Sequence, residues 1–163
     1  MSVATTVAEQ IAACLRTNWG LADPLAAADV HFDVGWVDRK QLRYKPQVIV
    51  SGPISSSMRY FTPRIVGGVA EPGLHLFSFA RYVVNVWIII PAGEESQRHA
   101  DWAELMRIEV VRILNEHRCD GGCYSAPLGC VFPLDYGRAL HELDVTPRII
   151  RYEVACQANY KVS

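Results

Sequence analysis

The sequence has few of the features that mark an enzyme or a nucleic-acid-binding protein. It contains neither a Gly-x-Gly-x-x-Gly nor a Gly-x-x-x-x-Gly-Lys motif, so no nucleotide phosphate site is predicted. Its 16 Lys and Arg residues face 17 Asp and Glu residues, and this balance excludes a generally basic surface for binding nucleic acid. No pair of acidic residues is spaced as a catalytic dyad. We therefore expect no catalytic residues and a protein that is not an enzyme.

Long hydrophobic runs are also missing. The longest apolar stretch, residues 83–91, contains Asn85 and is about half as long as a membrane-spanning helix. The first 20 residues carry Glu9, Gln10 and Arg16 among their apolar positions, which a signal peptide would not, so we interpret them as part of the fold. Five cysteines, an odd number, suit a reducing compartment better than a disulfide framework.

What the sequence does contain predicts one α+β domain over residues 1–163, a mainly antiparallel sheet packed against two α-helices. Thr6 followed by Glu9 forms a capping box that starts a helix over 6–18. Alternating apolar residues predict strands at 30–38 and 47–51, and the polar residues 39–44 between them suggest a hairpin. Residues 52–79 hold three prolines and four glycines without a sustained period, which predicts one long loop between strands two and three.

The second half of the chain shows clearer periodicity. Residues 80–91 are apolar on both faces of the predicted strand, which is typical of a central strand covered on both sides. Residues 94–118 predict the main helix, with an apolar stripe that includes Leu105 and with Ile108 and Val111 lying off that stripe. Residues 131–161 predict the C-terminal strands, and 150–160 alternate most regularly.

The segment HRCDGGCYSAPLGC, residues 117–130, gathers three of the five cysteines after the main helix. Four side chains could bind zinc, which prefers four nitrogen and sulfur ligands: His117, Cys119, Cys123 and Cys130. Their spacing within one short loop is unlike the usual two opposed pairs. A disulfide between two of the three cysteines, or a glycine-rich turn with cysteines packed as small apolar residues, are the alternatives. We therefore predict no cofactor, and a zinc ion at this segment is the one alternative. Cys14 and Cys156 lie on predicted apolar faces and are expected in the core.

A second group of residues has the composition of a protein interface. Aromatic and arginine side chains are enriched at such contacts, and the predicted long loop carries several of them. The alternative is a loop folded back over its own sheet. Together with the second apolar edge of the main helix, the candidate interface residues are Arg59, Tyr60, Phe61, Arg64 and Val111.

The order of these elements resembles the tail terminator and tail-completion proteins of tailed phages and tailed archaeal viruses. The resemblance rests on TTVAEQIAACLRTNWG, VHFDVGWVD with PQVIVSG, RYVVNVWIII with DWAELMRIEVVRILNEHR, and RYEVACQANYKV. It covers most of the chain through order and pattern, without a short diagnostic motif. The cysteine-rich turn and the long loop depart from the family.

The resemblance implies a non-enzymatic virion protein, assembled in the host cytoplasm into a homo-oligomeric ring, commonly a hexamer. Such a ring caps the tail tube, contacts the neck or connector proteins, and lets viral DNA pass without sequence-specific binding; no membrane is involved. The departures leave two further roles open, a head-closure or adaptor protein of the neck. A small zinc-stabilised binding module or thiol enzyme centred on residues 117–130 is the competing hypothesis.

Overall fold

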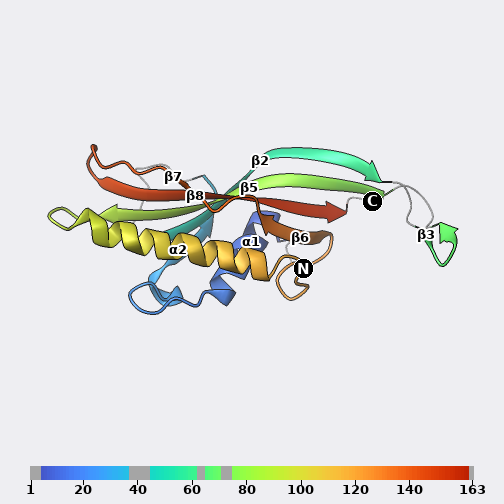
Figure 1. Ribbon diagram of the computed structural model, residues 1–163, viewed down its shortest axis with the longest axis horizontal. Helices are drawn as coiled ribbons and strands as arrows, with labels where there is room; N and C mark the ends of the chain where they lie inside the picture. The colour runs from blue at the N-terminus through green and yellow to red at the C-terminus, as the bar shows by residue number, and fades with distance from the viewer. Residues whose placement is uncertain (1–4, 37–44, 62–64, 71–74, 162–163) are drawn as a thin grey trace.

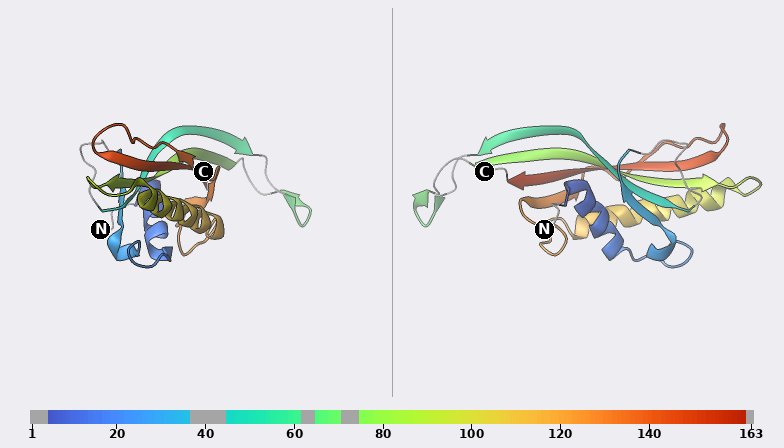
Figure 2. Two further views of the ribbon diagram at one scale, coloured as in Figure 1. Left: turned by 60° about the vertical axis from the view of Figure 1, so that its left-hand side comes forward. Right: turned by 180° about the vertical axis from the view of Figure 1, so that it is seen from behind.

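The computed structural model describes residues 5–36, 45–61, 65–70 and 75–161. They form an α+β fold in which a curved, mixed six-stranded sheet carries two α-helices on one face (Figure 1). The view from behind in Figure 2 places both helices on the same side of the sheet. The predicted combination of a mainly antiparallel sheet with two helices is therefore confirmed at the level of fold class.

Helix α1, Val7–Asn18, begins as the sequence predicts. The Thr6 hydroxyl accepts a hydrogen bond from the Glu9 backbone N–H, and the Glu9 carboxylate accepts one from the Thr6 N–H. Ile11 and Leu15, four residues apart, are fully buried. A short 3-10 helix, Ala27–Asp29, follows before the first strand.

Helix α2, Ser96–Glu116, lies within the predicted 94–118. Its buried face includes Ala103, Met106, Val110, Ile113 and Leu114. Leu105, predicted to belong to this face, is 49% exposed, so that prediction is wrong. Ile108 is 51% exposed, off the buried stripe as predicted. The helix therefore buries a narrower stripe than the sequence suggested and leaves an apolar edge outside.

The sheet has the strand order β1-β2-β5-β8-β6, with β7 also pairing with β8. Its members are β1 (His31–Val34), β2 (Gln47–Phe61), β5 (His75–Ile90), β6 (Leu128–Pro133), β7 (Arg138–Ala139) and β8 (Arg148–Lys161). The last strand thus lies between β5 and β6. All pairings are antiparallel except that of β1 with β2.

The predicted hairpin between 30–38 and 47–51 is wrong, because β1 runs parallel to β2. His31 pairs with Gln47 and Val34 with Val50. A parallel pair needs a crossover connection of about a dozen residues, and the interval between the two strands has that length. Residues 39–44, predicted as the turn, lie outside the described residues.

The predicted loop over 52–79 is also wrong, because most of its described residues are strand. β2 continues to Phe61 and β5 begins at His75, and the two pair from Ser55 with Arg81 to Phe61 with His75. The pairing register shifts between Ser51 and Ser55, which accommodates Pro53. β3 (Ile65–Val66) and β4 (Val69–Ala70) form a separate two-stranded sheet. We call β2 from Ser55 to Phe61 with its β5 partners the arm; Figure 1 shows it extending beyond both helices.

The main core lies between the helices and one face of the sheet. Alternate residues of the central strands contribute to it, among them Val84, Val86 and Ile88 of β5 and Val154 and Cys156 of β8. The opposite face carries a smaller buried cluster made of Ile49, Trp87, Ile89 and Ile149. The prediction that this strand is covered on both faces is therefore confirmed for residues 83–90 of β5.

The C-terminal region 131–161 is strand in part. β6 begins at Leu128, three residues before the predicted start, and the alternating pattern of β8 is confirmed. Within this region, residues 139–145 contribute only the end of β7 and an isolated bridge between Glu142 and Ile149. Two prolines, Pro133 and Pro147, and several polar residues in 133–147 leave little strand pairing possible there.

Candidate functional site

The cysteine-rich segment forms a compact turn between α2 and β6. His117 caps α2 and donates its backbone N–H to the Ile113 carbonyl at 3.0 Å. The Asp120 carboxylate then accepts the backbone N–H of Gly122 at 2.8 Å, and the Asp120 carbonyl accepts that of Cys123 at 3.0 Å. These bonds make a tight reversal of the kind that Asp and Gly favour. The turn alternative from the sequence is thus correct for the backbone.

Two of the three cysteines form a disulfide. Cys119 and Cys130 are bonded across a separation of 11 residues, with their Cα atoms 4.4 Å apart. The disulfide alternative is therefore confirmed, and the four candidate zinc ligands of this loop cannot act together, because a disulfide sulfur is not available as a thiolate ligand. The disulfide closes the loop that carries Asp120 and Cys123.

The third cysteine of the turn meets a cysteine from the other helix. The Cys123 sulfur lies 2.9 Å from that of Cys14 on α1. Cys14 is 2% exposed, so the prediction that it is buried is confirmed, but its sulfur faces another thiol instead of apolar neighbours alone. The Asn18 side-chain amide, one turn along α1, lies 3.4 Å from the Cys123 sulfur and 3.7 Å from that of Cys14.

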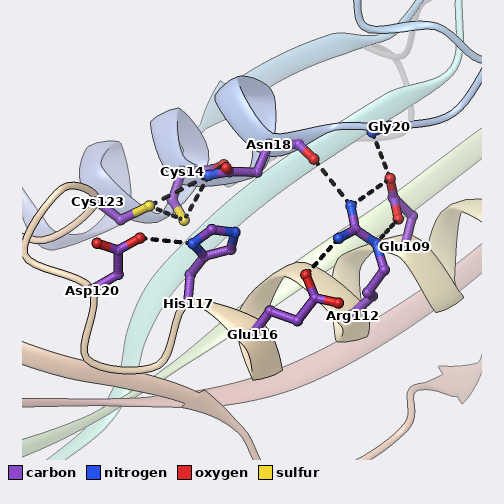
Figure 3. A network of polar contacts seen from close by, with 9 residues as sticks. All are labelled: Cys14, Asn18, Gly20, Glu109, Arg112, Glu116, His117, Asp120 and Cys123. Atoms are coloured by element: carbon purple, nitrogen blue, oxygen red, sulfur yellow. Dashed lines mark hydrogen bonds and ion pairs between the residues drawn. The ribbon is translucent and has the colours of Figure 1, made fainter.

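A histidine and a carboxylate complete this group. Nδ1 of His117 lies 2.8 Å from Oδ2 of Asp120, and the candidate ligand atoms of His117, Asp120 and Cys123 all lie within 4.8 Å of one another. Figure 3 shows these side chains converging on Cys14 from the end of α2 and the following turn. We call Cys14, His117, Asp120 and Cys123 the thiol cluster. The sequence pointed to His117 and Cys123, but no spacing pattern connects Cys14 to residues more than a hundred positions away.

The protonation of the thiol cluster follows from its surroundings. The hydrogen bond from His117, followed by that from the Gly122 backbone N–H, lowers the pKa of Asp120. Burial and the neighbouring Cys14 raise the pKa of Cys123 to about 12. Burial, followed by the neighbouring Cys14, also raises the pKa of Tyr124. Without a cation, the cluster therefore holds a protonated Cys123 thiol beside an ionised carboxylate.

A separate polar network joins the end of α1 to α2 beside the thiol cluster. Glu109, 6% exposed, accepts the Gly20 backbone N–H at 2.6 Å and forms an ion pair with Arg112. Arg112 also donates to the Asn18 carbonyl at 3.1 Å and pairs with Glu116 (Figure 3). Every buried carboxylate oxygen here has a partner, which identifies the network as a structural link between the helices.

The candidate interface residues are only partly brought together. Arg59 is exposed on the arm, with its guanidinium carbon 6.0 Å from the centre of the Phe79 ring. Tyr60 and Phe61 end β2, where their backbones pair with Leu76 and His75. Arg64 lies outside the described residues.

Val111 lies elsewhere, half-buried on α2 and packed against the main core. The outward apolar edge of the helix consists instead of Leu105 and Ile108. The sequence analysis assigned Leu105 to the buried stripe, because its helical spacing places it at the border between the buried and the exposed face.

Comparison with known proteins gives no family. No protein-family model matches the chain, and no curated protein matches it either. The resemblance to tail terminator proteins therefore stays a prediction. Among the described residues, no helix combines the length and the apolar character needed to cross a membrane.

Proposed function

We propose that the protein is a virion structural subunit that assembles into a homo-oligomeric ring, a hexamer, at the end of a viral tail. In this role, as a tail terminator, it joins the tail tube to the neck or connector proteins and leaves an open lumen for DNA. The same surfaces suit the head-closure and adaptor roles, which differ in the position of the ring within the particle.

The arm is the observation that carries the proposal. Residues 53–59 of β2 are exposed at every position, whichever face of the strand they occupy. In the part of the chain that the structure describes, no strand pairs with the outer side of β2 beyond Val50. β8 accompanies β5 as far as Phe77, so among the described residues only the two outermost pairs, Tyr60 with Leu76 and Phe61 with His75, are two-stranded. A two-stranded end of a sheet is marginally stable alone, and contact with a neighbouring subunit would stabilise it.

The surface of the arm contains apolar side chains that suit such a contact. Met58 on the arm is 64% exposed and Ile54, just before the arm, is 49% exposed, with the exposed serines 55–57 between them. Large apolar groups on an extended ribbon lose water-exposed area when a second chain covers them, which favours association.

A ring also needs a second surface that receives the arm. The apolar edge of α2 supplies a candidate, since Leu105 and Ile108 are exposed there and the turn after β6 adds Tyr136, 78% exposed. This edge lies on the helical layer, away from the arm tip (Figure 2). Two different surfaces that meet head to tail produce a closed ring when the rotation between subunits is favourable.

Electron microscopy of the purified full-length protein tests the proposal. The expected images show closed rings with a central opening and six-fold symmetry, with each arm lying on the next subunit. Imaging of the native particle then separates a tail-end position from a head-closure or adaptor position. A protein that is monomeric at the highest attainable concentration and absent from purified particles would contradict the proposal.

A further inference from the structure

We propose that the thiol cluster is a structural zinc site, with Cys14, His117, Asp120 and Cys123 as the four ligands. This site is independent of ring assembly. It differs from the set that the sequence suggested, because α1 supplies one sulfur and the disulfide removes Cys119 and Cys130.

The donor set fits zinc. Two sulfurs, one imidazole nitrogen and one carboxylate oxygen make four ligands of the types that zinc binds tetrahedrally. The ligands also come from two directions, since Cys14 projects from the middle of α1 and the others lie at the end of α2 and in the turn after it. Ligands from opposed segments are the usual arrangement of a structural site, and the sequence alone did not show it.

The ligand atoms of His117, Asp120 and Cys123 lie within 4.8 Å of one another, and Cys14 joins them through its contact with Cys123. The two sulfurs lie 2.9 Å apart, and Nδ1 of His117 lies 2.8 Å from Oδ2 of Asp120. With zinc–sulfur bonds of about 2.3 Å, two sulfurs in a tetrahedron are about 3.8 Å apart. Binding therefore requires the sulfurs to separate by about 1 Å, which side-chain rotation at Cys123 on the turn can supply.

The groups around the ligands suit thiolates better than thiols. Asn18 directs its side-chain amide toward both sulfurs, and an N–H donor stabilises the negative charge that a metal-bound sulfur carries. The Tyr124 side chain, 3% exposed, adds a buried hydroxyl donor beside Cys14. Zinc would replace the thiol protons and leave the sulfurs as acceptors for these donors.

A second disulfide, between Cys14 and Cys123, is the competing interpretation. It would account for the two sulfurs, and the contact between His117 and Asp120 would then serve only the turn. The zinc site gives all four side chains one common role. It would join α1 to the end of α2 on the helical layer of the fold, one turn from the network around Glu109.

Metal analysis of the full-length protein tests the proposal. The protein is produced in zinc-supplemented medium and purified without chelator or reductant, and its metal content is measured by mass spectrometry. We expect about one zinc per chain, lost in Cys14→Ser and Cys123→Ser. Cys156→Ser is the matched control, because Cys156 is a buried cysteine that bonds neither the cluster nor the disulfide, and this variant should keep its zinc.

Two further measurements keep the proposal falsifiable if the serine variants fail to fold. His117→Gln and Asp120→Asn change partly exposed side chains of the turn, and each should weaken zinc binding about tenfold or more in competition with a chromophoric chelator. In the cobalt-substituted protein, a thiolate-to-cobalt charge-transfer band is expected, and Cys156→Ser should retain it.

A thiol count separates zinc from a second disulfide. After denaturation in chelator without reductant, the wild-type protein should show three reactive thiols, those of Cys14, Cys123 and Cys156. One reactive thiol would overturn the proposal, because Cys14 and Cys123 would then be bonded to each other. Folded protein that takes up no zinc, or zinc that all four ligand variants retain, would also overturn it. None of these readouts depends on whether rings form.

Discussion

At the scale of single residues, Glu109 shows how a charge can be buried without loss of stability. It lies on the buried face of α2, yet its carboxylate oxygens are occupied by the Arg112 guanidinium and the Gly20 backbone N–H. Burial alone would raise the pKa of Glu109, but the hydrogen bonds from Arg112 and Gly20 outweigh it and hold the pKa below its ordinary value of 4.5.

We expect Glu109→Gln to lower the free energy of unfolding at neutral pH by about 1.5–3 kcal/mol, because charge-assisted hydrogen bonds to a buried group are lost. Since folding lowers this pKa, the contribution of Glu109 is fully present above pH 4.5 and disappears as the pH falls through the lowered value. Urea unfolding of both proteins at several pH values should show curves that converge in acid. A difference that is independent of pH would contradict this explanation. Glu104→Gln, at an exposed carboxylate of the same helix, is the control.

Gly52 is a second residue whose identity is dictated locally. Its φ is +142°, and a Cβ atom there would lie 2.8 Å from a ring carbon of Tyr82, which is buried. The position marks the irregularity in β2 where the arm departs from the core.

We expect Gly52→Ala to lower the free energy of unfolding by about 1–3 kcal/mol, through backbone strain and the clash with Tyr82. Thermal or urea unfolding measures the change. Gly129→Ala is the control: a Cβ atom there meets only a backbone oxygen at 3.5 Å, and its φ is not in the left-handed region. Equal losses in the two variants would show that neither the strain nor the clash matters.

At the scale of secondary-structure elements, the arm is where the structure departs most from the sequence prediction. Its β2 strand is exposed on both faces, so no apolar residue needs to alternate with a polar one, and the serines, Gly52 and Pro53 resemble a loop in composition. The helices and β8 were predictable because each has a buried face opposite a more accessible one. The parallel pairing of β1 with β2 was not predictable, because a short strand shows the same alternation of apolar and polar residues whether its neighbour is parallel or antiparallel.

The candidate sites divide in the same way. His117 and Cys123 were found because nearby residues of a loop stay near in space. Their partner Cys14 was missed, since contact between α1 and the turn arises only when both helices pack on the sheet. Asp120 has the sequence signature of a turn residue, and nothing in that signature distinguishes a turn from a ligand.

On the proposed function, Met58→Asp should abolish ring formation and leave the monomer folded. Met58 is 64% exposed on the arm, so a charge there costs the monomer little but prevents an apolar contact with a neighbour. Analytical ultracentrifugation measures assembly, and thermal unfolding measures stability. Val145→Asp, at a valine that is 56% exposed outside the arm, should still form rings. If Met58→Asp assembled like the wild type, the arm would not be the contact.

The two edges of α2 should respond differently to a charge. Ile108→Asp, on the exposed edge, is expected to weaken assembly with a change in the free energy of unfolding below about 0.5 kcal/mol. Val111→Asp, at a half-buried position against the core, is expected to destabilise the fold by about 1–3 kcal/mol. Sedimentation and urea unfolding of both variants distinguish these outcomes. Normal assembly by Ile108→Asp would exclude the edge from the ring contact.

At the scale of the whole molecule, the sheet is built largely from contacts between distant parts of the chain. β2 pairs with β5, and β5 with β8, along nearly the full length of each pair. α1, near the beginning of the chain, contacts β1, β2 and α2. Stability is therefore shared between segments that no local pattern connects, which is why the order of elements was predictable and their arrangement was not.

The place of β8 between β5 and β6 also has a consequence for synthesis. When a ribosome has completed β6, both neighbours of the missing strand exist, yet residues 148–161 have not been made, so the long edge of β5 has no partner. A chain ending at Pro147 should accordingly aggregate instead of folding as a sheet with one strand fewer. Its solubility and cooperativity of unfolding, compared with the full chain, measure this. The nascent protein therefore exposes an unpaired edge of β5 until β8 has been synthesised.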